Sequence, residues 1–294
     1  MVLHRHAKYL FLLPVVLYLL VLCVYPFGYN IAVGFEDLGL QNFTSGAVHF
    51  IGLENFRGLF QSDAFPLVVH NAPIFTLGSV VPQFLIGGCI ALLLRKQTRL
   101  ARFARALVLF PWLLPFIAVS TVFIWFFDGT NGLVNWILQS VHIINAPVAW
   151  LASPSLALWV VILANIWIGI PFNFVLLLGG LQAIPHEMHE AAVVDGATWW
   201  SELIHITIPL MRDTILAVLI LGIIGTVKVF DLVWIMTTGG PANATQLPAT
   251  LSYQLSFQNF QFGQGAAMAD LMVLVLTVLA CIYIWLTHLS NNVW

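Results

Sequence analysis

The hydrophobic positions of this chain fall into long runs, separated by shorter segments that hold the charged residues. A membrane-spanning helix needs about 20 consecutive, mainly apolar residues, and proline inside such a helix is tolerated. Six runs are long enough, and they lie at about 9–33, 67–94, 106–127, 156–181, 215–236 and 266–287. The pattern predicts an all-α membrane protein, folded as a single transmembrane domain over residues 1–294.

Composition also makes lipid the expected solvent of this chain. Hydrophobic residues make up 61% of the sequence and charged residues 7%, whereas a soluble domain has about 25% charged residues. The segment from Tyr9 to Phe35 has no Lys, Arg, Asp or Glu, and it is too long for the apolar region of a cleavable signal peptide. We therefore expect it to be retained as the first membrane helix. The 10 Lys and Arg are too few and too scattered to form a nucleic-acid-binding face.

The basic residues predict the orientation of the chain. Arg5 and Lys8 precede the first run, a cluster at 95–105 separates the second run from the third, and Arg212 precedes the fifth. Because Lys and Arg concentrate in cytoplasmic loops, these segments are expected to be cytoplasmic. The prediction is a multi-pass protein of the cytoplasmic (inner) cell membrane, with a cytoplasmic N-terminus and a cytoplasmic C-terminus. The segments facing outward are then 36–65, 128–155 and 237–265.

One cytoplasmic segment, residues 185–209, has the residues of a short helical hairpin. Pro185 suits the first turn of a helix, and Glu187 favours its N-terminus. Gly196 can end that helix in a left-handed conformation. A second short helix is expected at about Trp199–Ile206, and Pro209 is expected to break it before the fifth run. The segment therefore predicts a compact knob with an acidic flank.

This segment resembles the EAA loop of binding-protein-dependent ABC importer permeases. The matching residues are Glu190-Ala191-Ala192, Asp195-Gly196-Ala197, Ile206 and Pro209. Ile208 stands where the family usually has Leu, Leu203 replaces a frequent Phe, and a second Pro after Pro209 is absent. In the family this loop, the coupling helix, sits in a cleft of the ATPase subunit. The resemblance implies that the residues coupling the chain to the ATPase are Glu190, Ala191, Ala192, Asp195, Gly196 and Ala197; a plain interfacial linker is the alternative.

A second stretch resembles the larger permease subunit of carbohydrate importers such as the maltose and lactose systems. It comprises Phe230-Asp231 and Thr237-Thr238-Gly239-Gly240-Pro241, followed by an aromatic-rich segment to Gly263. This resemblance implies the type I ABC importer permease fold, with six transmembrane helices and a coupling helix. It also implies half of the translocation path for a sugar or sugar-like solute. A glycerol-phosphate or other polar solute is the alternative, and a secondary transporter is the rival class.

The partners follow from the same resemblance. They are a second permease subunit in a heterodimer, a dimer of ATPase subunits, an extracytoplasmic solute-binding protein and membrane lipid, without nucleic acid.

A phosphate-binding loop needs Lys after Gly, and none of Lys8, Lys96 and Lys228 follows a glycine. The chain is therefore expected to be a transport subunit and not an enzyme. It should bind no cofactor, and ATP and Mg should be held by the partner ATPase. No metal site is expected either, since the two histidines of 186–190 lack the spacing of a zinc motif.

Polar side chains inside the apolar runs are candidates for the substrate path. Ionisable groups within a membrane are costly unless they are paired or wetted. Lys228 and Asp231 are three residues apart, which places them on one face of a continuous helix. They could line the solute cavity or neutralise each other between packed helices. Asp270 could contact solute or face the outer vestibule, and Asn165 and Asn173 could bind solute or join helices.

Overall fold

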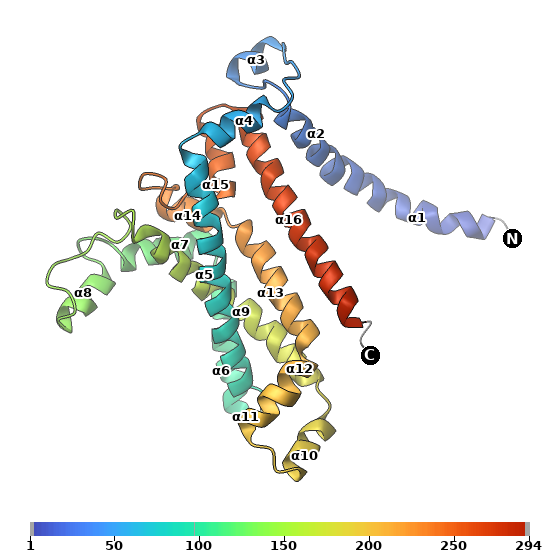
Figure 1. Ribbon diagram of the computed structural model, residues 1–294, viewed down its shortest axis with the longest axis vertical. Helices are drawn as coiled ribbons and strands as arrows, with labels where there is room; N and C mark the ends of the chain where they lie inside the picture. The colour runs from blue at the N-terminus through green and yellow to red at the C-terminus, as the bar shows by residue number, and fades with distance from the viewer. Residues whose placement is uncertain (1–2, 97, 292–294) are drawn as a thin grey trace. The chain divides into compact units, whose positions relative to one another are not determined.

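A computed structural model describes residues 3–96 and 98–291 of the chain (Figure 1). The described residues fold as helices and connecting loops, with an isolated β-bridge between Glu36 and Phe50. Apart from the residues outside the described ranges, the chain forms two compact units. The first unit comprises Met1–Phe65 and Leu251–Leu274, and the second comprises Pro66–Thr250 and Val275–Trp294.

The first unit begins with a long apolar helix, whose parts are α1 (Leu3–Leu19), the π-helical turn η1 (Leu20–Val24) and α2 (Tyr25–Gly34). Buried Asn55 in α4 holds the end of α2, because its Nδ2 donates to the carbonyls of Gly34 at 3.0 Å and Glu36 at 2.8 Å. Other helices with residues in this unit are α3 (Leu40–Ser45), α4 (Glu54–Gln61), α15 (Pro248–Tyr253), η4 (Gln254–Gln258) and α16 (Phe262–Asn291).

The second unit is packed around α9 (Ala157–Ala183), which contributes more of its buried apolar residues than any other helix. On one side, Val161 and Ala164 pack with Leu232 and Val233 in one apolar cluster. Along the helix, Gly87 of α5 (Ala64–Leu93) lets the two backbones approach closely: a Cβ at Gly87 would lie 2.9 Å from the backbone nitrogen of Phe174. Small residues of this kind allow close helix packing in membranes.

The other helices of the second unit surround α9 and extend from it (Figure 1). Before α9 come α6 (Arg99–Leu109), the 3₁₀ turn η2 (Phe110–Leu113), α7 (Phe116–Phe126) and α8 (Leu133–Ser140). After it come α10 (His186–Val194), α11 (Trp199–Glu202), the π-helical turn η3 (Leu203–Thr207), α12 (Ile208–Leu210), α13 (Arg212–Val227) and α14 (Asp231–Thr237).

Four of the described helices are long and apolar enough to cross a membrane: Phe11–Gly34, Ala64–Leu93, Ala157–Ala183 and Phe262–Trp285. Two further pairs meet the same criteria together but are sharply bent. Arg99–Leu113 meets Phe116–Phe126 at 95°, and Trp199–Leu210 meets Arg212–Val227 at 70°. The described chain therefore has up to six spans, if each bent pair counts as one.

The prediction of one continuous helix at 215–236 is wrong. Helix α13 ends at Val227, and α14 begins at Asp231 after a short break. The charges of Lys228 and Asp231 favour this break. Lys228 follows the C-terminus of α13, and Asp231 occupies the first turn of α14. A cation at a helix C-terminus and an anion at a helix N-terminus are each favoured by the helix dipole, so this sequence stabilises two helix ends.

Candidate functional site

The residues expected to couple the chain to an ATPase lie on and just after α10. The helix begins directly after Pro185 and carries Glu187 in its first turn. It ends in a left-handed glycine, since Gly196 has φ +72°. The nitrogen of Gly196 donates to the carbonyl of Val193 at 3.1 Å, and that of Ala197 donates to the carbonyl of Ala192 at 2.9 Å. These two bonds are a Schellman motif, so the predicted left-handed helix end at Gly196 is confirmed.

The motif residues on and just after α10 fall into two groups by their solvent exposure. Ala192 is buried, at 4% exposure. Glu190, Ala191, Asp195 and Gly196 are exposed, and Ala197 is half-buried. The exposed group is therefore free to meet another protein.

Sequence reasoning missed two neighbouring residues on the same helix. Val193 is 71% exposed and Val194 is 85% exposed. The pattern that could have identified them is a pair of adjacent apolar residues in a segment rich in acids and expected to face water. Adjacent exposed apolar residues are candidates for an interaction site.

The second half of the hairpin differs from its prediction. Thr198 is the N-cap of helix α11, and its Oγ1 accepts a hydrogen bond from the nitrogen of Ser201 at 3.3 Å. The chain then stays helical through Pro209 as far as Leu210. It does so because η3 is a π-helical turn, in which Ile208 donates to Leu203 five residues earlier. This turn accommodates the missing donor of Pro209, and the bend comes later, at Met211.

Glu202 joins three segments of the second unit. Its Oε1 accepts a hydrogen bond from Nδ1 of His189 on α10 at 2.7 Å. The same oxygen lies 3.5 Å from Nη1 of Arg95, just beyond the end of α5. The Glu202 side chain is 13% exposed, that of His189 is 24% exposed and that of Arg95 is 34% exposed. Neither Glu202 nor His189 was predicted to have a role, because only the fold brings them together with Arg95.

Two asparagines expected in the substrate path lie on α9. Asn165 lines a cavity of about 170 Å³ with Gln83, Phe172 and Thr226. Its backbone carbonyl accepts from Nε2 of Gln83 at 2.8 Å, and among the described residues its own buried Nδ2 has no hydrogen-bond partner. Asn165 therefore keeps an unpaired, buried donor next to this cavity.

Asn173 has a different setting on the same helix. It is fully buried, and its Nδ2 donates to the carbonyl of Gly169 at 3.0 Å. It does not line the cavity beside Asn165.

The charged pair Lys228 and Asp231 is not brought together as expected. Both side chains are exposed, and no ion pair within 4.0 Å joins them in the described part of the chain. The inference that they share one helix face is wrong, because the helix breaks between them. Their contact with a solute stays a prediction.

Asp270 of α16 belongs to the first unit. Its Oδ1 accepts from Nδ2 of Asn30 on α2 at 2.9 Å, while its buried Oδ2 lies beside Gly34 and has no hydrogen-bond partner in the described part of the chain. Asp270 thus joins the first and last long apolar helices within this unit.

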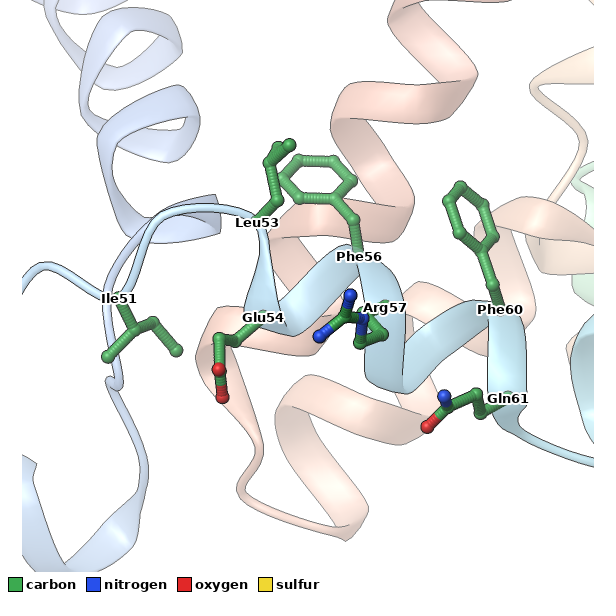
Figure 2. A pocket seen from close by; sticks show the side chains of 7 residues that line it. All are labelled: Ile51, Leu53, Glu54, Phe56, Arg57, Phe60 and Gln61. Carbon is green, nitrogen blue, oxygen red and sulfur yellow. The ribbon is translucent and has the colours of Figure 1, made fainter.

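The first unit also has an open groove of about 740 Å³ along α4. Figure 2 shows Leu53, Phe56 and Phe60 projecting on one side of α4, and Glu54 and Gln61 on the other. The orientation predicted from the basic residues would place this groove on the outer side of the membrane.

Residues 83–294 match the family described as binding-protein-dependent transport system inner membrane component. The sulfoquinovosyl glycerol transport system permease protein SmoG of Agrobacterium fabrum is 32% identical, covering 95% of this chain and 90% of that protein. The trehalose/maltose transport system permease protein MalF of Thermococcus litoralis is 30% identical, covering 96% of this chain and 94% of that protein.

A solved structure shows the same fold. It is a bacterial ABC transporter involved in the import of the acidic polysaccharide alginate, and one of its chains aligns with a TM-score of 0.81 and 22% identity. The alignment covers 99% of this chain and 97% of that chain. This chain therefore belongs to the family of inner membrane components of binding-protein-dependent transport systems and has the type I ABC importer permease fold.

Proposed function

We propose that this chain is the membrane subunit of an ATP-driven importer, and that it forms half of the translocation path for a sugar or sugar-like solute. The observation that carries the proposal is the surface of α10. A short helix, closed by a Schellman motif, presents Val193 and Val194 beside Glu190. Apolar side chains exposed on a knob of this kind suit docking into a cleft of another protein. The partner is a separate ATPase subunit, which holds ATP and Mg.

The solute class is supported by the relatives. The similar proteins include permeases of uptake systems for trehalose/maltose, for diacetylchitobiose and for xylose/arabinose. A sugar offers many hydroxyl groups, and the unpaired Nδ2 of Asn165 is a suitable donor for one of them. Glycerol phosphates and other polar solutes are the alternative that a transport assay must separate.

The mechanism is alternating access. A solute-binding protein delivers the solute at the outer loops, and the groove along α4 is one surface there that combines apolar and charged side chains. ATP-driven closure of the ATPase dimer displaces α10. Rocking of this chain against a second permease subunit then opens the path first to one side of the inner membrane and then to the other. In this arrangement both termini are cytoplasmic.

The test is assembly and transport of the complete complex in vesicles. Val194→Asp places a charge on the apolar patch of α10, and Val141→Asp is the matched control, since Val141 is 58% exposed but lies outside the coupling loop. We expect the first variant alone to lose the ATPase subunit on purification. Retention of the ATPase by the Val194→Asp variant would refute docking at α10. Uptake of a glycerol phosphate, with no uptake from a panel of mono- and disaccharides, would refute the sugar assignment.

A further inference from the structure

Three segments of the second unit meet at Glu202. The helix expected to dock on the ATPase contributes His189, the hairpin's second helix contributes Glu202, and the segment after α5 contributes Arg95. A carboxylate accepts hydrogen bonds and donates none, so the Nδ1 of His189 is the donor in the 2.7 Å bond. One largely buried oxygen, Oε1, therefore holds two different segments.

The contact continues from Arg95 into the body of the unit. Arg105 on α6 donates from Nη2 to the carbonyl of Leu94 at 2.6 Å and from Nε at 3.2 Å. Its Nη2 also reaches the carbonyl of Arg95 at 3.4 Å. Arginine at a helix C-terminus satisfies carbonyls that the helix leaves unpaired. The end of α5 is thus fixed to α6 on one side and to Glu202 on the other.

Helix α5 leads from this end to the cavity beside Asn165. Its Gln83 lines that cavity and donates to the Asn165 carbonyl at 2.8 Å. A rigid helix carries a displacement from one end to the other, so movement at Arg95 reaches Gln83. Figure 1 shows α6, α10 and α11 at the same end of this unit.

We infer that Glu202 transmits the displacement of α10 to the C-terminal end of α5, with His189 and Arg95 as the two groups it holds. The inference rests on the proposed function, because α10 must be moved by an ATPase. Glu202 is a positioning residue: it touches neither solute nor nucleotide. The hydrogen bond from His189 and the ion pair with Arg95 both involve the Glu202 carboxylate, and charge-assisted contacts are stronger than neutral ones. The Glu202 side chain is 13% exposed, which limits screening of these contacts by salt.

The experiment measures solute transported per ATP hydrolysed by the full complex in vesicles. Glu202→Gln and Arg95→Gln are each expected to lower this ratio at least about fivefold, the lower end of coupling between linked sites. Complex yield and bound ATPase should not change. The double variant should have a transport ratio no lower than that of the more impaired single variant, since both changes break the same link. Arg95→Lys should recover part of the ratio.

Lys96→Gln is the matched control. It removes one positive charge beside Arg95, from an exposed side chain. An equal loss in this variant would assign the effect to bulk charge and overturn the inference. Wild-type ratios in both Glu202→Gln and Arg95→Gln, or additive losses in the double variant, would overturn it as well.

A cross-link tests the same link without weakening the fold. Cysteines are placed at 95 and 202 in a chain whose Cys23, Cys89 and Cys281 have been replaced. Before cross-linking, this chain should have the low transport ratio of the double variant, because both linking side chains are gone. If the two segments move together, the cross-link should restore the ratio, and no recovery on cross-linking would overturn the inference. A failure of the proposed function would differ from all of these outcomes, since the wild-type chain itself would then bind no ATPase.

Discussion

The left-handed glycine that ends α10 allows a sharp test of the coupling loop. An added Cβ at Gly196 would meet nothing within 4 Å. The cost of Gly196→Ala therefore comes from backbone conformation alone, and for a left-handed residue that cost is about 1–2 kcal/mol. This energy corresponds to about a 5- to 30-fold change in a local equilibrium. Asn tolerates the left-handed region better than Ala, so Gly196→Asn should have a smaller effect.

Two measurements follow in the assembled complex. Hydrogen exchange of the peptide covering 186–197 should rise by about 5- to 30-fold in Gly196→Ala, because the two Schellman bonds open more often. Solute-stimulated ATPase activity should fall, while the amount of chain in the membrane stays unchanged.

The matched control is Gly46 at the end of α3. It has φ +71°, caps a helix, and also leaves an added Cβ in open space. Gly46→Ala therefore carries the same strain at a position outside the coupling loop, and it should leave ATPase stimulation intact. Unchanged exchange in Gly196→Ala, or an equal loss of stimulation in Gly46→Ala, would refute the reasoning.

Three further predictions concern orientation, the broken helix and an outer loop. Reporter fusions within 95–102 should be cytoplasmic and those near Asn243 external; the opposite result at Asn243 would remove the predicted orientation. Because no ion pair joins Asp231 to Lys228, Asp231→Asn should lower transport but not complex yield, and lost yield restored by exchanging the two residues would contradict this. The pKa of Asp128 lies below its ordinary value of 3.8, chiefly because its carboxylate accepts from the nitrogen of Asn131 and from Thr130. The stability that Asp128 contributes is present above pH 3.8 and is lost as pH falls through the lowered pKa. Hydrogen exchange of its loop, corrected for the intrinsic effect of pH on exchange, should therefore rise in that pH range in wild type and not in Asp128→Ala.

The helices of this fold were largely predictable because their cause is local. Long apolar runs place α5, α9 and α16 within a few residues of their observed ends. The end of α10 was predictable for the same reason, since the left-handed turn requires only Gly196 itself.

The breaks were not predicted, since apolar residues dominate on both sides of each one. The run at 106–127 bends by 95° between Leu113 and Phe116, where Pro115 precedes α7. At 228–231 the information was present, because a basic residue followed by an acidic one suits two helix ends facing each other. Hydrophobicity averaged over a span does not register such a pair.

The Glu202 link could not be predicted from any one of its three sequence segments alone. Its residues lie on α10, on α11 and after α5, and only tertiary packing brings them together. Each residue alone resembles an ordinary solvated charge of a cytoplasmic loop.

The structure of the segment from α10 to α13 explains why the Glu202 contact would be needed to transmit movement. Helix α10 is short and closed by a Schellman motif, so it can move as one piece. Its covalent route onward to α13 passes through the π-helical turn η3 and then a 70° bend at Met211. Both features interrupt the regular hydrogen-bond ladder and are the positions at which a helix yields most easily. A displacement of α10 would therefore be partly absorbed along the chain, whereas the contact through Glu202 reaches α5 directly.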